Sequence, residues 1–230
     1  RVQLEPLRAL NPLDRLQAYF EDRVFNVAVE RAAIDGVIDL SIPGARGIRR
    51  TLPELKGTLD WYGLNYYTRW MVRSLSPVPH VARPGAPLSD LGWELWPAGL
   101  EPALVSAGRL GKPVLVTENG VPDARDVLRP AALVTSVQAM HAAIARGVQV
   151  LGYLHWSLLD NFEWSDGYTG RFGLYAVDFD HPDRPRTRRT SAEVFARTAR
   201  ANALTDEARA AANVTPNADT VAARRDHGPG

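Results

Sequence analysis

The sequence of 230 residues contains no cysteine. Disulfide frameworks, iron–sulfur clusters and zinc sites with thiolate ligands are therefore excluded. No apolar run approaches the ~20 residues that a transmembrane helix needs. The charge is nearly balanced, with 27 Lys+Arg against 26 Asp+Glu, whereas a nucleic-acid-binding domain normally has a basic face. We therefore expect neither a nucleic acid nor a membrane as a partner, and we expect a cytoplasmic location.

Motifs for metals and nucleotide cofactors are also missing. The sequence has no GxGxxG segment and no P-loop, so the two common phosphate-binding loops are absent. Its histidines show no spacing that suits metal ligation: His80, His141, His155, His181 and His227. We expect no metal and no cofactor.

The composition that remains is that of a globular protein, with 45% hydrophobic and 23% charged residues. Asn11 and Pro12 predict the start of a helix, because Asn is a good N-cap and Pro suits the first helical position. An apolar stripe follows at steps of three and four residues: Leu13, Leu16, Phe20, Val24 and Val27. We expect this stripe to face a core.

Apolar strands then alternate with helices, which predicts an α/β fold with a parallel sheet. The expected strands are 58–65, 114–117 and 149–156, and the expected helices are 98–107, 131–145 and 192–201. A proline-rich segment at 74–92 predicts a long irregular loop. The small and polar residues from Leu204 onward predict a disordered tail over 204–230.

Polar and aromatic residues gather where the expected strands end, which is the face that carries active sites in parallel α/β proteins. Asn65 and Tyr67 follow one strand, Glu118 ends the next, and Trp156 ends the third. A carboxylate at a strand end is also compatible with a helix cap or an ion pair, and a tryptophan with core packing. Together, however, carboxylates, an amide and aromatic faces are what a sugar site requires.

Five segments carry a resemblance to family 1 glycoside hydrolases, the β-glucosidase family, in that family's order. They are LDWYGLNYYTRW, GWELWPAGL, PVLVTENG, GYLHWSLLDNFEWSDGY and RFGLYAVDFD. The resemblance implies a (β/α)8 TIM barrel, of which residues 1–203 would supply roughly the last three strands and their helices. It also implies a retaining β-glycosidase of the β-glucosidase type.

The resemblance assigns roles to single residues near the first two strand ends. Glu118 in TENG matches the catalytic nucleophile, while Asn65 and Tyr67 match groups that contact the sugar and orient that nucleophile. A hydrogen bond from the Tyr67 hydroxyl would stabilise the ionised form of Glu118.

Further roles fall on the segment after the third strand. Trp156 matches the platform on which the sugar stacks, and Phe172 matches a residue that lines the pocket. Glu163 and Trp164 match the pair that binds the hydroxyls far from the reacting carbon. The run 165–168 lacks the Ser and Lys pattern of 6-phospho-glycosidases, which favours an unphosphorylated β-glucoside or related β-glycoside.

The sequence departs from the family at the second catalytic group. Retaining hydrolysis uses two carboxyl groups ~5–5.5 Å apart, and the family's acid/base Glu lies in an Asn-Glu-Pro motif that is absent here. The resemblance thus places the acid outside this chain, in a missing N-terminal barrel half. Two alternatives remain: a truncated, non-catalytic sugar-binding remnant, or an unrelated α/β scaffold. We expect these residues alone to be neither a stable monomer nor a competent hydrolase.

Overall fold

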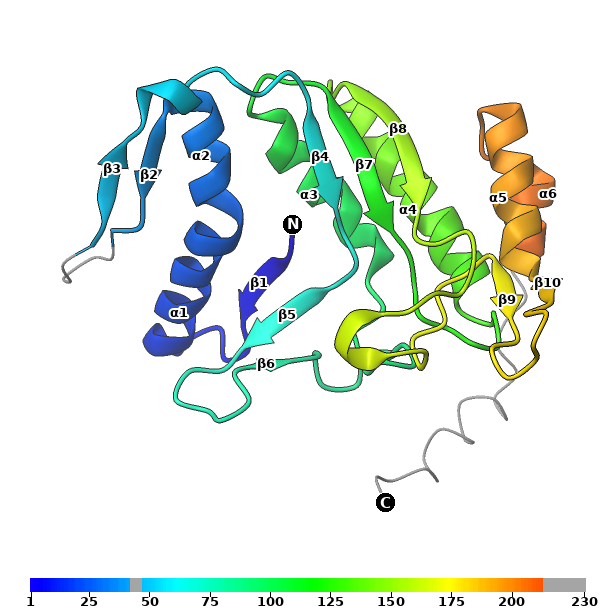
Figure 1. Ribbon diagram of the computed structural model, residues 1–230. Helices are drawn as coiled ribbons and strands as arrows, with labels where there is room; N and C mark the ends of the chain where they lie inside the picture. Colours follow the sequence, from blue (N-terminus) through cyan, green and yellow to red (C-terminus); the bar gives the residue numbers. More distant parts are fainter. Residues whose placement is uncertain (42–46, 213–230) are drawn as a thin grey trace. The chain divides into compact units, whose positions relative to one another are not determined.

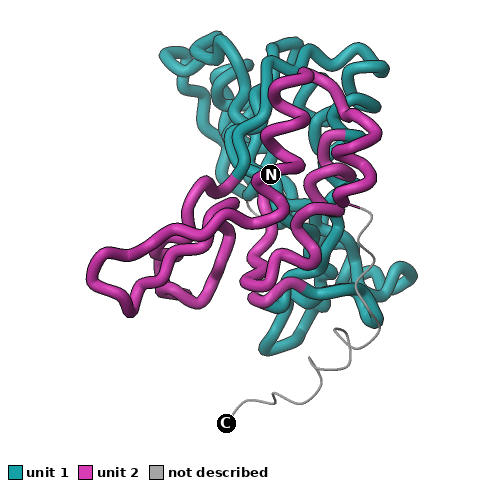
Figure 2. The backbone as a smooth tube through the Cα atoms, turned by 90° about the vertical axis from the view of Figure 1, so that its right-hand side faces the viewer, with its two compact units in different colours: residues 1–88, 92–119, 138–155 teal, residues 89–91, 120–137, 156–230 magenta. Residues whose placement is uncertain are grey.

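The computed structural model describes residues 1–41 and 47–212. The chain forms two compact units that interleave along the sequence (Figure 2). Unit 1 comprises 1–88, 92–119 and 138–155, and unit 2 comprises 89–91, 120–137 and 156–230.

Unit 1 contains the three-stranded parallel sheet that the sequence predicts. Its strand order is β4 (Tyr62–Asn65), β7 (Val114–Asn119) and β8 (Val150–His155) (Figure 1). Because all three strands run in one direction, their carboxyl ends lie at the same edge of the sheet. The described residues form no closed barrel, and β4 and β8 are the edges of this sheet.

An apolar core lies beneath this sheet and fixes the strands. Helix α3 (Leu100–Gly108) and the second half of α4 (Arg129–Ala145) supply its helical side. The fully or nearly fully buried members are Leu64, Tyr66, Leu100, Ala103, Leu104, Ala107, Val114, Val116, Ala139, Ala143 and Val148. Because apolar residues fill the space beneath the strands, the strand ends are held on a close-packed support.

The predicted N-terminal helix is present as α1 (Pro12–Asp22), a π-helical turn (Arg23–Val27) and α2 (Ala28–Asp35). Asn11 caps it, since its side chain accepts hydrogen bonds from the backbone N–H groups of Leu13 and Asp14.

The apolar stripe on this helix is buried only in part, with Phe20, Val24 and Val27 half-buried. Leu13 and Leu16 are 49% and 43% exposed, whereas Asp14 and Asn26 are buried. Polar contacts turn the helix this way: Asp14 accepts hydrogen bonds from Arg8 and Ser74, and Asn26 donates to the Val2 carbonyl.

Several short strands of unit 1 have no counterpart in the sequence predictions. They form the sheet β1-β5-β6 and the hairpin β2-β3, with bounds Gln3–Pro6, Arg69–Val72, His80–Val81, Val37–Asp39 and Arg49–Thr51. All three residues of β3 are exposed, so this strand shows no alternation of apolar and polar side chains. The segment 74–92 is otherwise irregular, as predicted.

Unit 2 contains the first half of α4, the hairpin β9-β10 (Tyr175–Val177 and Arg186–Arg188), α5 (Thr190–Ala201) and α6 (Asp206–Ala212). The predicted tail is wrong for α6, because Ala208 and Ala212 are buried in a core with Leu133, Val134 and Val194. In the sequence these alanines resemble the small residues of a disordered tail. In the structure their small side chains allow this short helix to pack closely against its neighbours. The rest of the predicted tail lies outside the described residues.

No helix within residues 1–41 and 47–212 has the length and apolar character needed to cross a membrane.

Candidate active site

Glu118 lies near the carboxyl end of β7, where the parallel sheet places polar side chains together. The Tyr67 hydroxyl donates a hydrogen bond of 2.7 Å to the Glu118 carboxylate oxygen Oε2. The backbone N–H of Tyr66 donates to the Glu118 carbonyl at 2.9 Å. The predicted contact between Tyr67 and Glu118 is thus present, and both ends of the glutamate residue are held by the chain that follows β4.

Asn65 also lies at this edge, as expected, but its side-chain oxygen is hydrogen-bonded to a residue other than Glu118. The Thr117 hydroxyl donates to Asn65 Oδ1 at 2.6 Å. Asn65 and Glu118 are paired residues across the β4-β7 ladder. The ladder therefore brings Asn65 beside the glutamate through the backbone.

Trp93 is a neighbour of this cluster that the sequence reasoning missed. Its ring meets the Tyr67 ring edge to face, with centroids 5.9 Å apart. Trp93 lies in GWELWPAGL, one of the five segments that carry the family resemblance. That segment is the signal in the sequence that could have identified it. Because the indole covers the Tyr67 ring, it limits the positions that the phenol can take.

A buried ion pair supports the chain on either side of these aromatic residues. Glu94 accepts hydrogen bonds from Arg69 at 2.7 and 3.0 Å, and the Thr68 hydroxyl donates to the Glu94 carbonyl at 2.7 Å. Burial raises the pKa of Glu94, but the hydrogen bonds from Arg69 and from the Arg83 N–H outweigh it, so that the pKa is lowered. Glu94 is therefore ionised at neutral pH and holds Arg69 in place.

In unit 2, the loop after β8 brings together two of the predicted sugar-binding residues. The Trp156 indole N–H donates to Glu163 Oε1 at 3.1 Å. A backbone hydrogen bond of 2.6 Å from the Glu163 N–H to the Gly167 carbonyl closes the turn that carries this glutamate. The seven-residue spacing of the sequence thus becomes a direct contact.

The other two predicted sugar-binding residues of unit 2 differ in burial. The Trp164 side chain is 85% exposed, on a short 3-10 turn over 164–166. Phe172 is only 2% exposed. Trp164 is therefore open to solvent, whereas Phe172 is enclosed by the surrounding chain.

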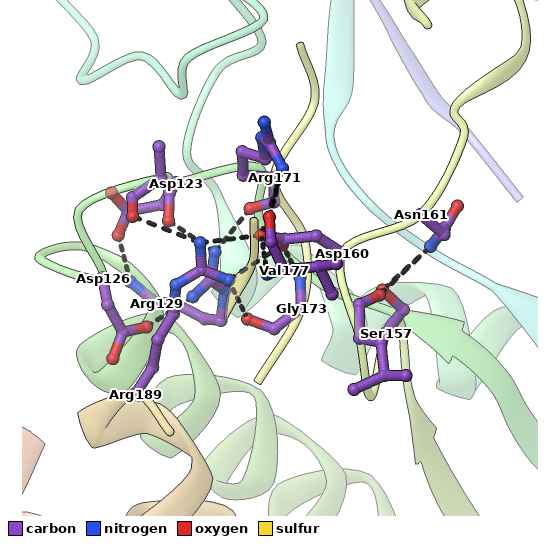
Figure 3. Close-up of polar contacts among 12 residues, drawn as sticks. Asp123, Asp126, Arg129, Ser157, Asp160, Asn161, Arg171, Gly173, Val177 and Arg189 are labelled. Atoms are coloured by element: carbon purple, nitrogen blue, oxygen red, sulfur yellow. Dashed lines mark hydrogen bonds and ion pairs between the residues drawn. The ribbon is translucent and has the colours of Figure 1, made fainter. Parts of the chain in front are cut away.

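Ion pairs anchor this loop at its base (Figure 3). Asp160 accepts two hydrogen bonds from Arg189, at 2.8 and 3.0 Å, and two more from the N–H groups of Gly173 and Val177. Its side chain is 1% exposed. A buried carboxylate is stable only when its oxygens are paired in this way, so Asp160 fixes the chain on both sides of the Glu163 turn.

A second ion-pair cluster of unit 2 surrounds the guanidinium of Arg129, which is fully buried (Figure 3). It donates to the Asp126 carboxylate and to the backbone carbonyls of Val121, Asp123 and Arg171. Burial lowers the pKa of Arg129. The cluster ties the loop after β7 to the start of α4 and to Arg171.

Metal ligation finds no support within the described ranges 1–41 and 47–212. No group of three or more His, Cys, Asp or Glu side chains there has an arrangement that could hold a metal ion.

Comparisons with known proteins place this chain among glycoside hydrolases. The profile of Glycosyl hydrolase family 1 matches residues 49–204. A beta-galactosidase from Pyrococcus woesei is 37% identical in an alignment of 195 positions that covers 75% of this chain and 37% of that protein. A beta-galactosidase from Saccharolobus solfataricus is 44% identical in an alignment of 168 positions that covers 67% of this chain and 34% of that protein.

Solved structures give the same result. A beta-glycosidase from Pyrococcus horikoshii is similar with a TM-score of 0.78 and 31% identity, covering 94% of this chain and 50% of that one. The beta-glycosidase from Thermosphaera aggregans has a TM-score of 0.72 and 34% identity, covering 92% of this chain and 44% of that one. These glycosidases are (β/α)8 barrels, and the described residues correspond to part of that fold. The chain spans about a third of the length of the curated relatives that it matches.

Proposed function

The chain belongs to glycosyl hydrolase family 1, and from this premise we propose that it carries the nucleophile half of a retaining β-glycosidase. Glu118 is the nucleophile in this proposal, and the substrate is a β-glucoside or a related β-glycoside. The observation that carries the proposal is the 2.7 Å hydrogen bond from Tyr67 to Glu118 at the carboxyl end of β7. It holds one carboxylate oxygen and orients the group for attack.

The first chemical step follows from this geometry. A Glu118 oxygen bonds to the anomeric carbon while the bond from that carbon to the aglycone oxygen breaks, and the leaving oxygen takes a proton from a general acid. The ionised carboxylate is the nucleophilic form, and the hydrogen bond from Tyr67 holds one of its two oxygens. Water then hydrolyses the glycosyl-enzyme, which restores Glu118 and releases the sugar with its configuration retained.

Recognition of the sugar belongs to unit 2 in this proposal. Glu163 accepts hydrogen bonds from the hydroxyls far from the reacting carbon, and Trp156 and Trp164 offer aromatic faces to the sugar. The Trp156 N–H holds one oxygen of Glu163 at 3.1 Å, so the carboxylate has a fixed direction before the sugar binds. The run 165–168 favours an unphosphorylated glycone.

The general acid lies outside this chain in the proposal, because the Asn-Glu-Pro motif is absent from the 230 residues. Loss of general acid help typically costs ~10²–10⁴-fold in rate. A substrate whose leaving group needs no proton, such as a dinitrophenyl β-glucoside, avoids that loss. The same absence favours a second candidate function, that of a sugar-binding remnant without turnover.

Covalent trapping distinguishes the two functions. A fluorinated glucosyl fluoride has a leaving group that needs little acid help, and its fluorine slows hydrolysis of the glycosyl-enzyme. We expect mass spectrometry of the treated chain to show one added fluoroglucosyl group, mapped to the peptide that contains Glu118. Labelling of Glu163 would overturn the assignment of the nucleophile, and sugar binding without any labelling would establish the remnant.

A further inference from the structure

The β7 strand contains one residue more than its neighbours at the point where Glu118 emerges. Towards β4, Leu64 pairs with Val116, but the next residue, Asn65, pairs with Glu118. Towards β8, β7 again has an extra residue beyond Val116, because Asn119 pairs with His155. Such a bulge redirects the side chains that follow it, so the direction of Glu118 depends on how the bulge is held.

Asn119 supplies hydrogen bonds on both sides of this bulge, where the regular ladder is interrupted. Its side-chain N–H donates to the Tyr66 carbonyl at 2.7 Å, towards β4. Its side-chain oxygen accepts from the Tyr153 hydroxyl at 2.9 Å, towards β8. One buried amide therefore connects the ends of all three parallel strands.

Tyr153 can donate to Asn119 in this arrangement, because its hydroxyl lies 2.9 Å from the side-chain oxygen and 3.3 Å from the backbone carbonyl of Asn119. Its ring belongs to β8, and Nδ1 of His155 lies 3.2 Å from the same hydroxyl. Burial raises the pKa of Tyr153 well above its ordinary value, so the phenol keeps its proton. A neutral amide between a fixed donor and a fixed acceptor has a single favourable orientation.

We infer that Asn119 and Tyr153 are positioning residues that hold the β7 bulge and so direct the Glu118 carboxylate. The inference rests on the proposed function, because it concerns the aim of the same nucleophile. Neither side chain touches the carboxylate itself. Their effect reaches Glu118 through the backbone: the Tyr66 carbonyl is held by Asn119, and the Tyr66 N–H donates to the Glu118 carbonyl at 2.9 Å.

The first test measures labelling of Glu118 by the fluorinated glucosyl fluoride in the 230-residue chain. Tyr153→Phe removes one hydroxyl without changing the shape of the ring. We expect its rate constant of labelling at saturating probe to fall about tenfold, which corresponds to one hydrogen bond, while the probe's binding constant stays within about twofold. For Asn119→Ala, which releases both sides, we expect a fall of about 10²-fold, as for a misplaced reacting group. Tyr19→Phe, on the exposed face of α1, is the matched control.

A second measurement needs no reaction and keeps the inference separate from the proposed function. Hydrogen exchange at the Tyr66 amide reports on the bond to the Glu118 carbonyl. We expect exchange there to become at least about tenfold faster in Tyr153→Phe and Asn119→Ala, with no change in Tyr19→Phe.

Unchanged exchange at Tyr66 in both variants would overturn the inference, whether or not the chain is labelled. Faster exchange with an unchanged labelling rate would also overturn it, because the two residues would then be structural only. If the unmutated chain is not labelled, the proposed function fails, and the exchange result alone decides whether Asn119 and Tyr153 hold the bulge.

Discussion

Glu118 and Glu163 are both carboxylates of the predicted site, but they are held in different ways. Glu118 is part of strand β7, whose backbone is paired on both sides. Glu163 lies in a loop, on a turn closed by one backbone hydrogen bond to Gly167. A strand fixes a group through backbone pairing along its length, whereas a loop residue depends on a few local hydrogen bonds and on the anchors of its loop.

The supports beneath the two carboxylates differ as well. Apolar side chains such as Leu64, Val114 and Val116 fill the core under Glu118. Buried ion pairs, above all Asp160 with Arg189, anchor the loop of Glu163. An apolar core tolerates small losses, but a buried ion pair that loses one member leaves an uncompensated charge. The difference fits a division between chemistry, which needs fixed geometry, and recognition, which needs directed polar groups.

The largest effect on stability is expected when the anchor of unit 2 is broken. Asp160→Ala leaves the buried Arg189 without its carboxylate and two backbone N–H groups without an acceptor, which should cost about 3–5 kcal/mol in the free energy of unfolding. Chemical denaturation followed by tryptophan fluorescence measures this loss.

The matched control for Asp160→Ala is Glu193→Ala, because Glu193 pairs with Arg197 at the surface, at 2.8 Å. Its removal should cost less than about 1 kcal/mol. Hydrogen exchange at Gly173 and Val177, which donate to Asp160, should rise first. A loss as small as that of the control would refute the role of the ion pair as anchor.

Glycone recognition should respond to Glu163 next. With an activated dinitrophenyl β-glucoside, Glu163→Ala should lower kcat/KM about 10²-fold, because hydroxyls lose bonds to a charged acceptor. An analogue that lacks the far hydroxyls should lose much less. Glu101→Ala, at the surface beside Arg146, serves as control. Equal losses with both substrates would mean that Glu163 is structural.

A smaller effect is expected from the bond that orients the nucleophile. Tyr67→Phe keeps the ring against Trp93 and removes only the hydroxyl. The rate of labelling of Glu118 should fall about tenfold, since one hydrogen bond to a charged group is lost. An unchanged rate of labelling would contradict the role of Tyr67.

The smallest expected effect tests whether the stability of unit 1, which contains the parallel sheet, also depends on a charged group. Hydrogen bonds from Arg8 and Ser74 hold the pKa of the Asp14 carboxyl well below its usual range. The resulting stabilisation is present above the ordinary pKa and is lost as the pH falls towards the folded-state value. Asp14→Asn should therefore flatten the decline in stability between about pH 5 and about pH 2, and Asp35→Asn should leave it unchanged. An equally steep decline in Asp14→Asn would show that the Asp14 carboxyl is not the source of this pH dependence.

The sequence predicted those parts of the molecule in which local chemistry and tertiary structure agree. Asn11 and Pro12 are suited to start a helix, and the apolar run at Val114 is suited to a buried strand; both elements are present. The Tyr67–Glu118 contact was also predicted, through the resemblance. The catalytic and binding roles of these residues remain predictions.

Other features depend on distant partners and left no local pattern. The extra residue of β7 beside Thr117 becomes visible only when three strands are paired. The exposed Leu13 and Leu16 follow from polar contacts that turn the opposite face inward. Helix α6 is stabilised by burial of alanines that a composition rule assigns to a tail.

The most direct test of the account is chemical rescue of Glu118→Ala with azide and a dinitrophenyl β-glucoside. If Glu118 is the nucleophile, its removal opens space on the face opposite the leaving group, and azide attacks the anomeric carbon there with inversion. The account predicts α-glucosyl azide as the product of Glu118→Ala and no such product from Glu163→Ala. Formation of β-glucosyl azide by Glu118→Ala, or of α-glucosyl azide by Glu163→Ala, would contradict it.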